Sequence, residues 1–218
     1  MKSQLKFIDL FAGLGGFHEA LSGLGAKCVF ASELDEDLSI LYEKNFGIKP
    51  HGDIREVAVD NIPNHDVLCA GFPCQPFSKA GVQKGLNCPR WGDLIDYVIS
   101  ILRHKKPRFF ILENVPNIFK HDNGRTWQSI CQRLIDAGYD IDYDFLSPHM
   151  FGIPQRRERA FIVGAQSKID GLFGFTWPKP ATSPSVSIKS ILDIDPPDAS
   201  KLTTDKLYYL SVWQEFIA

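Results

Sequence analysis

The 218-residue chain is 44% hydrophobic and carries a formal net charge of −2. A chain of this size can bury one sizeable core and begin a second domain, and its charge gives no overall basic field of the kind that marks nucleic-acid binding. No apolar run approaches the ~20 residues that span a membrane, and the N-terminus lacks a signal-peptide pattern. The five cysteines are scattered without a Cys-x-x-Cys pair, which argues against a disulfide framework and a zinc site and favours a cytoplasmic protein.

Apolar runs of strand length alternate with segments of helical spacing as far as Gly164. In chain order the pattern predicts a strand at 5–11, a helix ending at 24, a strand at 27–32, a helix at 36–46, a strand at 66–71, a helix at 94–103, a strand at 108–112, a helix at 125–137, and strands at 141–146 and 159–164. This alternation predicts an α/β fold with a doubly wound, mostly parallel sheet flanked by helices.

The composition changes after Gly164. Residues 173–185 are rich in proline, threonine and serine, and 189–218 shows only short amphipathic pieces. We therefore predict a first domain at 1–170 and a separate segment at 171–218.

The run Gly-Phe-Pro-Cys-Gln-Pro-Phe-Ser at 71–78 follows the apolar strand predicted at 66–71. Pro73 and Pro76 fix φ and remove backbone donors, so the chain must turn and hold Cys74 at the tip of a stiff loop beyond the strand. In open α/β sheets, ligands bind at the carboxyl ends of the strands. A small buried thiol is the simpler interpretation of an isolated Pro-Cys pair, so the case for a functional cysteine depends on its neighbours.

A glycine-rich turn, Gly13-x-Gly15-Gly16, follows the first predicted strand and suggests a nucleotide or nucleoside held by backbone N–H groups. It matches neither the dinucleotide pattern nor a phosphate-binding P-loop. Glu33, at the end of the second predicted strand, is placed to accept hydrogen bonds from ribose hydroxyls, and Asp53 could offer its carboxylate to an adenine. An adenosine site without a diphosphate cradle favours S-adenosylmethionine over NAD, although each acid alone could equally be an ordinary surface residue.

Two further motifs are Glu113-Asn114-Val115 and Gln155-Arg156-Arg157-Glu158-Arg159. Together with the segments at 7–16, 33–35, 52–54 and 71–78, they make the chain closely resemble the DNA (cytosine-5) methyltransferases of bacterial restriction–modification systems over about residues 5–165. Any one three-residue motif carries no weight, whereas the combination is highly specific. The resemblance implies a Rossmann-like, S-adenosylmethionine-dependent methyltransferase that acts on double-stranded DNA, with 1–170 as its catalytic and cofactor-binding domain.

The chemistry of the family implies a role for each matched catalytic residue. Carbon 5 of cytosine is a poor nucleophile, so a thiolate, which is Cys74 by the resemblance, must first add to carbon 6. Glu113 would hold a proton at N3 and accept a hydrogen bond from the exocyclic amine, provided that burial raises the pKa of Glu113. Arg159 would donate to the carbonyl oxygen of the base, and Arg157 would fix the acid and the cysteine loop. A buried Glu–Arg pair with a purely structural role is the alternative interpretation.

The target base must leave the duplex before these groups can reach it. The residues expected to contact DNA are Phe72 and Pro73 as a wall for the flipped ring, Gln75 as a filler of the gap in the helix, and Ser78 and Arg90 in a loop at 78–92 that is long enough to close as a lid. The residues expected to hold S-adenosylmethionine are Phe11, Gly13, Leu14, Gly15, Gly16, Glu33, Leu34, Asp53, Ile54 and Pro73.

The family also carries a second domain that reads the DNA sequence, and we expect 171–218 to be a linker and the start of an incomplete recognition domain. A truncated enzyme and a split enzyme with a second polypeptide as partner are both compatible with this expectation. Trp91-Gly92-Asp93 replaces the apolar pair that usually follows Arg90 in the family. Three alternatives remain. A tRNA cytosine-5 methyltransferase is disfavoured because no Cys-Phe-Thr element occurs, and a non-catalytic partner subunit is disfavoured because Cys74 and Glu113 are present. A redox cysteine protein is disfavoured because no resolving cysteine lies close in sequence to Cys74.

Overall fold

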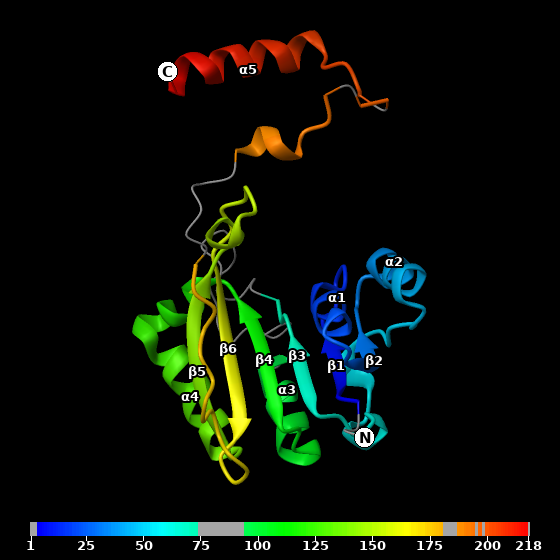
Figure 1. The fold of residues 1–218 in the computed structure, drawn as a ribbon, viewed down its shortest axis with the longest axis vertical. Helices are drawn as coiled ribbons and strands as arrows, with labels where there is room; N and C mark the ends of the chain where they lie inside the picture. The colour runs from blue at the N-terminus through cyan, green and yellow to red at the C-terminus, as the bar shows by residue number, and fades with distance from the viewer. Residues whose placement is uncertain (1–3, 74–93, 181–186, 195, 198, 218) are drawn as a thin grey trace.

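The computed structural model describes residues 4–73, 94–180, 187–194, 196–197 and 199–217. One six-stranded sheet with helices on both faces forms the body of the molecule, and a long C-terminal segment leaves it (Figure 1). Four of the predicted site residues, Cys74, Gln75, Ser78 and Arg90, lie outside the described residues.

The strands lie in the order β2-β1-β3-β4-β6-β5 across the sheet. They are β1 (Lys6–Leu10), β2 (Lys27–Ser32), β3 (Val67–Ala70), β4 (Phe109–Asn114), β5 (Tyr139–Leu146) and β6 (Arg159–Gln166). β1 pairs in parallel with β2 and β3, and β3 pairs in parallel with β4. β6 runs antiparallel to both β4 and β5. The predicted α/β fold with a mostly parallel sheet is therefore confirmed, and β6 is its reversed strand.

The strand order reverses beside β1. The chain passes from β1 to β2 on one side and later forms β3 on the other side of β1. In open α/β sheets a crevice forms at such a point, outside the carboxyl ends of the strands. The neighbouring strands β1 and β3 are buried because the sheet is covered on both faces: the four residues of β3 are buried, as are the last four of β1, which include Asp9.

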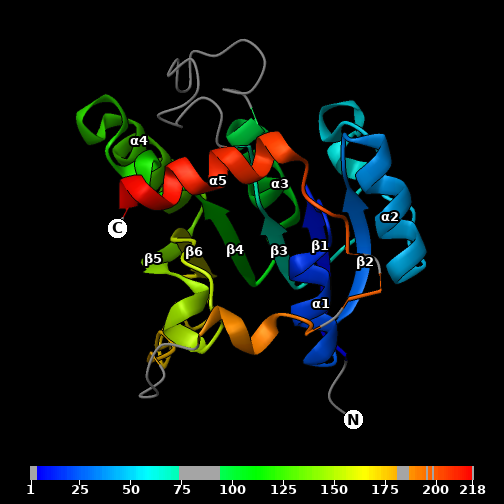
Figure 2. The same ribbon diagram turned by 90° about the horizontal axis from the view of Figure 1, so that it is seen from above.

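The helices are α1 (Gly16–Gly23), α2 (Glu36–Phe46), α3 (Leu94–Lys105), α4 (Arg125–Asp136) and α5 (Thr204–Ile217). Figure 2 shows α1 on the opposite side of the sheet from α3 and α4. Alternate residues of β1 and β3 point to opposite faces of the sheet. Ile8 and Leu68 pack in the large core under α3 and α4, whereas Phe7 and Cys69 pack in a smaller core with Leu21 of α1.

Most predicted elements are confirmed with small changes at their ends. The strand at 27–32 and the helix at 36–46 have the predicted bounds, whereas α3 continues two residues beyond 103 and β5 begins two residues before 141. The prediction for 189–218 was wrong, because α5 is a 14-residue helix rather than a set of short pieces.

The C-terminal segment first follows the sheet and then departs from it. The indole N–H of Trp177 donates to Asp142 Oδ2 at 2.9 Å, which holds this part of the segment against β5. Every described residue from 187 to 216 is exposed, and α5 stands apart from the body beyond the carboxyl ends of the parallel strands (Figure 1). Among the described helices there is none whose length and apolar character would let it cross a membrane.

Candidate active site

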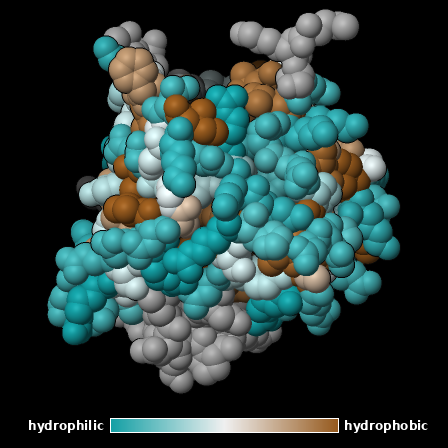
Figure 3. Space-filling model, turned by 90° about the horizontal axis from the view of Figure 1, so that it is seen from below, coloured by the Kyte–Doolittle hydropathy of each residue, from teal (hydrophilic) through white to brown (hydrophobic). Residues whose placement is uncertain are grey.

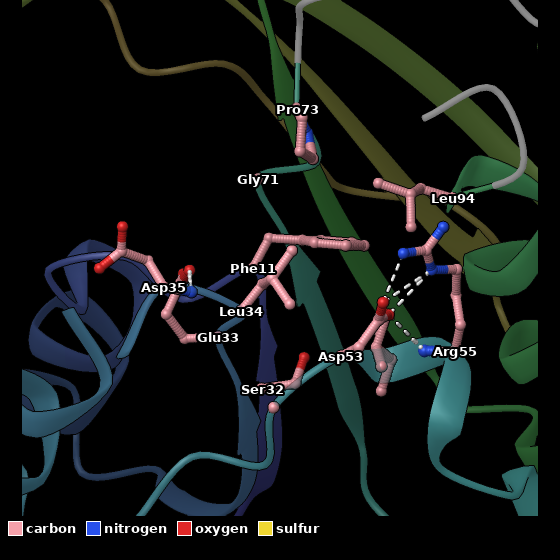
Figure 4. Close-up of a pocket in the computed structure, with 12 residues that line it drawn as sticks. Phe11, Ser32, Glu33, Leu34, Asp35, Asp53, Arg55, Gly71, Pro73 and Leu94 are labelled. Atoms are coloured by element: carbon pink, nitrogen blue, oxygen red, sulfur yellow. Dashed lines mark hydrogen bonds and ion pairs between the residues drawn. The ribbon is translucent and has the colours of Figure 1, made fainter. Parts of the chain in front are cut away.

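A pocket of about 460 Å3 lies at the point where the strand order reverses. Figure 4 shows Phe11 in the middle of this pocket, with Glu33 and Asp35 on one side and Asp53 and Arg55 on the other. The lining residues come from the segments after β1, β2 and β3, from η1 (Ile54–Glu56) and from the start of α3; they are Phe11, Ser32, Glu33, Leu34, Asp35, Gly52, Asp53, Ile54, Arg55, Gly71, Pro73 and Leu94.

The turn after β1 combines several unusual backbone conformations. Phe11 has a φ of 56°, which places a bulky residue in the left-handed region, and Gly13 and Gly15 follow with φ values of 54° and 84°. Non-glycine residues in this region cost free energy and concentrate at functional sites. A Cβ at Gly15 would overlap the ring of Phe46 from α2, so glycine is required there for a second reason. The turn is therefore built to bring β1 to α1 within very little space.

Glu33 fixes this turn to the end of β2. Its Oε2 accepts the backbone N–H of Gly13 at 2.7 Å, and its Oε1 accepts the backbone N–H of Asp35 at 2.9 Å. Asp35 in turn caps α2 by accepting the N–H of Leu38 at 3.0 Å. A carboxylate offers about four acceptor positions, so two remain for a ligand in the pocket.

Among the described residues, the hydrogen-bond partner of Asp53, across the pocket from Glu33, is Arg55. Its Oδ1 accepts the backbone N–H of Arg55 at 3.0 Å, as the cap of η1, and the guanidinium of Arg55 contacts both carboxylate oxygens. Hydrogen bonds from the Arg55 side chain are the main reason that the pKa of Asp53 lies below its usual value. Asp53 is therefore ionised and acts as an acceptor in the neutral pH range.

A second group of charged residues lies at the carboxyl end of β4. Because β6 is antiparallel to β4, its first residue, Arg159, lies beside Glu113, near the end of β4. Arg159 Nε is 2.8 Å from Glu113 Oε1. Burial raises the pKa of the Glu113 carboxyl, while the positive charges of Arg159 and Arg157 oppose the shift. The reversed strand thus brings Arg159 to Glu113, whereas the sequence motifs led us to expect Arg157 as the residue that fixes the acid.

The Glu113–Arg159 pair borders a hollow of about 420 Å3. Apolar side chains supply most of its walls, and Arg157 reaches it from a segment held by a hydrogen bond from the Arg157 backbone N–H to Ser147 Oγ at 3.0 Å. The lining residues are Glu113, Leu146, Ser147, Pro148, Phe151, Ile153, Gln155, Arg157, Arg159 and Phe161. Such a hollow could receive a flat, mostly apolar ring with a few polar edge groups.

The chain that leads to Cys74 begins next to Glu113. A Cβ at Gly71 would lie 3.6 Å from Glu113 Oε2, so the residue that follows β3 lies beside the acid. The buried Asn114 donates from Nδ2 to the carbonyl oxygen of Phe72 at 3.1 Å and accepts the N–H of Val115 at 2.9 Å. Asn114 therefore ties the start of the cysteine loop to β4, a role that the sequence motif did not specify.

The predicted residues fall into three groups. Phe11, Glu33, Leu34, Asp53, Ile54 and Pro73 line the pocket beside β1, whereas Gly13, Leu14, Gly15 and Gly16 do not. Glu113, Arg157 and Arg159 meet at the hollow beside β4. Phe72, expected as a wall for the flipped ring, is buried in the large core and lines neither space. The cysteine loop lies outside the described residues. Sequence reasoning did not name six of the residues that line the pocket beside β1 as ligands. Asp35, Gly52 and Gly71 lie in the matched motifs without an assigned role, whereas Ser32, Arg55 and Leu94 lie outside them.

Comparison with solved structures defines the class of this fold. The structure matches the Entamoeba histolytica methyltransferase EhMeth with a TM-score of 0.74 and 21% sequence identity, over 94% of this chain and 64% of that one. It matches the S. pombe Dnmt2 methyltransferase with a TM-score of 0.67 and 24% identity, over 88% of this chain and 62% of that one. The sheet and its helices therefore form a Rossmann-like methyltransferase fold.

Comparison of sequences identifies the family. A family model of the C-5 cytosine-specific DNA methylases matches residues 5–215, so the chain belongs to this family. It is 44% identical over 193 residues to the type II methyltransferase M.BsuFI of Bacillus subtilis, covering 88% of this chain and 47% of that protein. It is 42% identical over 215 residues to M.HpaII of Haemophilus parainfluenzae, covering 97% of this chain and 57% of that protein. The chain thus spans about half the length of the curated relatives it matches.

Proposed function

We propose that these residues form the catalytic part of a DNA (cytosine-5) methyltransferase, which transfers a methyl group from S-adenosylmethionine to carbon 5 of a flipped-out cytosine in double-stranded DNA. The observation that carries the proposal is the Glu113–Arg159 pair at 2.8 Å, placed against the end of β3 three residues before Cys74. Membership of the C-5 cytosine-specific DNA methylase family supports this assignment of the site.

The pocket beside β1 suits S-adenosylmethionine by the chemistry of its groups. Glu33 offers free acceptor positions for ribose hydroxyls, Asp53 offers an acceptor for an amine, and Phe11 offers an aromatic surface for a purine. Leu34 and Ile54 add apolar walls, and Pro73 connects the pocket to the cysteine loop. The N–H of Gly13 is already bonded to Glu33 and is therefore not free to bind the cofactor. The glycine turn contributes to the cofactor site mainly by holding Phe11 and Glu33 in position. When bound, the cofactor supplies an electrophilic methyl group on its sulfonium.

The protein groups then carry the reaction in two steps. The Cys74 thiolate forms a bond to carbon 6 of the cytosine, and the ring electrons move to carbon 5, which becomes able to take up the methyl group. Glu113, with its raised pKa, holds a proton at N3 and so limits the negative charge on the ring. After transfer, a base or a water molecule takes the carbon-5 proton, the electron pair of the carbon 5–hydrogen bond forms the carbon 5–carbon 6 double bond, the carbon 6–sulfur bond breaks, and the thiolate leaves.

Arg159 and Arg157 complete the base site. Arg159 holds Glu113 in place and has further donors for the carbonyl oxygen of the base, because a guanidinium carries five N–H groups. The apolar hollow around them would accept the ring after it leaves the duplex, at a cost of a few kcal/mol in lost stacking. Gln75, Ser78 and Arg90 would contact the DNA from the loop at 78–92, as expected from the sequence.

DNA recognition is proposed to come from a second polypeptide segment. The support is the C-terminal helix α5, whose described large apolar residues are all exposed, including Tyr209, Trp213 and Phe216. An uncovered apolar surface of this kind normally marks an interaction site. We propose 1–170 as the catalytic domain and 171–218 as the connection to the recognition part, in a cytoplasmic protein as the cysteine pattern indicates.

The nucleophile provides the decisive experiment. A protein that joins these residues to a recognition part is incubated with S-adenosylmethionine and a pool of random-sequence duplexes that carry 5-fluorocytosine in place of cytosine. Fluorine cannot leave as a proton does, so the Cys74 adduct is trapped and remains intact under denaturing conditions. Cys74→Ser should abolish the adduct, whereas Cys131→Ser, a matched change on α4 away from both pockets, should leave it unchanged. An adduct that persists in Cys74→Ser refutes the proposed nucleophile.

A further inference from the structure

Arg55 lies in the proposed cofactor pocket, yet neither the sequence motifs nor the proposed reaction gives it a role. Its backbone N–H donates to Asp53 Oδ1 at 3.0 Å, its Nε lies 2.9 Å and 3.0 Å from the two carboxylate oxygens, and its Nη2 contacts Oδ2. Both residues line the pocket and lie on the same side of Phe11 (Figure 4). The pair is half-buried, since the exposed fractions of the two side chains are 32% and 16%.

This contact determines what Asp53 can still do. Three N–H groups of Arg55 are directed at its carboxylate, which has about four acceptor positions, so roughly one position remains for a ligand. The guanidinium never loses its proton, and the pKa of Asp53 is held below its usual value by Arg55. Asp53 is therefore an acceptor in a fixed orientation, and it cannot become a donor at neutral pH.

We propose that Arg55 is a specificity-determining residue, which acts through Asp53 to select a purine with a 6-amino group over a purine with a 6-oxo group. The inference rests on the proposed function, because it assigns the adenine end of the cofactor to this side of the pocket. A 6-amino group donates to the remaining acceptor position of Asp53. A 6-oxo group would place a carbonyl oxygen against an ionised carboxylate, and Nε and Nη2 of Arg55 are already directed at Asp53.

The test compares two ligands that differ only in this substituent, S-adenosylhomocysteine and S-inosylhomocysteine. Calorimetry measures their affinities for the 218-residue chain, for Arg55→Ala and for Arg55→Lys. The unaltered chain should bind the amino ligand about tenfold or more tightly than the oxo ligand, as one hydrogen bond to a charged group implies. Both variants should reduce this ratio to about threefold or less, because neither alanine nor the point charge of lysine can hold Asp53 with a fork of donors.

The matched control is Arg125→Ala, which removes a similar short-range pair, with Asp122, on the exposed surface. It should leave both affinities unchanged. If Arg55 only stabilises the fold, both ligands weaken together in Arg55→Ala and the ratio is preserved, which overturns the inference and leaves the proposed function intact. If the unaltered chain binds neither ligand, the proposed cofactor site fails and the inference fails with it. Arg55→Lys gives the ratio independently if Arg55→Ala does not fold.

Discussion

At the scale of single residues, Asp9 on β1 is a buried carboxyl that burial makes difficult to ionise. Asp9 is 1% exposed; Tyr42 Oη lies 3.4 Å from its Oδ2, and the backbone N–H of His18 in α1 also contacts the carboxylate. Its Oδ1 has no hydrogen-bond partner among the described residues. Burial raises the pKa of Asp9 to about 7 from an ordinary 3.8, so the ionised form is unfavourable inside the protein.

The raised pKa makes stability depend on pH. Between the ordinary pKa of 3.8 and the folded-state pKa of about 7, the folded protein binds this proton more readily than the unfolded chain does. Stability therefore falls as pH rises through this range, and the loss is complete above it, at about 4 kcal/mol at most. We expect Asp9→Asn, which cannot ionise, to remove this slope from urea unfolding measured between about pH 5 and about pH 8.

The control for this prediction is Asp37→Asn, because Asp37 is an exposed carboxylate at the start of α2. That variant should retain the slope of the unaltered chain. If Asp9→Asn and the unaltered chain show parallel curves, the carboxyl of Asp9 does not titrate near neutrality. A parallel result would mean that Asp9 ionises at its ordinary pKa in the folded protein.

Residue identities in the site could be predicted from sequence better than their contacts. Glu33 and Asp53 were predicted as pocket acids because each follows a buried strand or lies in a short motif, and both line the pocket. The glycine turn was predicted to bind the ligand through its N–H groups, but that of Gly13 is bonded to Glu33. A glycine pattern indicates that a tight turn is present, whereas the direction of each N–H depends on the fold. No sequence pattern marked Arg55, because its proposed role depends on its contact with Asp53 in the folded structure.

At the scale of elements, the reversed strand β6 marks the limit of sequence reasoning. Alternating strands and helices predict parallel pairing, and this holds from β1 to β4. Between β5 and β6 the described structure has only a short 3-10 helix, Pro148–Phe151, in place of a crossover helix, so the two strands pair antiparallel. The consequence for function is direct, since this reversal brings Arg159 to Glu113.

The sequence pattern also failed to predict the helix α5. Its residues show little separation of polar and apolar faces, and the described ones are exposed. A periodic pattern indicates a helix only when one face packs against a core. Sequence periodicity therefore identified α3, which buries one face, and not α5.

The packing of α1 against α2 leads to a prediction about Gly15. A Cβ at this position would overlap the ring of Phe46, and the φ of 84° is unfavourable for any side chain. Gly15→Ala should lower the free energy of unfolding by about 1 kcal/mol from the backbone alone and by a further ~1–3 kcal/mol from overpacking. Urea unfolding of the purified variant measures the sum.

Two neighbouring glycines separate these contributions. Gly13→Ala meets no atom within 4 Å but has a φ of 54°, so it should cost only the backbone part. Gly16→Ala has neither restriction and should change stability by less than about 0.5 kcal/mol. Equal effects of the alanine changes at Gly13 and Gly15 would show that Phe46 moves aside at no cost.

At the scale of the whole molecule, both proposed sites lie at one end. Both the pocket and the hollow lie at the carboxyl ends of the parallel strands, and α5 stands beyond this same end (Figure 1). The opposite end is mostly hydrophilic, with hydrophobic residues in small separate groups (Figure 3). The exposed apolar side chains of α5 lie at the same end as both proposed sites, and the chain spans about half the length of its curated relatives.

The exposure of the C-terminal segment leads to the last prediction. Lys189, Lys201 and Lys206 are exposed and lie where no described side chain is buried, so brief trypsin treatment should cut there first. Lys44, which is exposed on α2 but belongs to a helix packed on the sheet, should be cut much more slowly. A shortened chain ending at residue 180 keeps the contact of Trp177 with Asp142 and should unfold within about 0.5 kcal/mol of the full chain. Mass spectrometry of the fragments and urea unfolding measure these two outcomes. Protection of the three lysines, or a large loss of stability on shortening, would show that α5 packs on the body in solution and does not present a free docking surface.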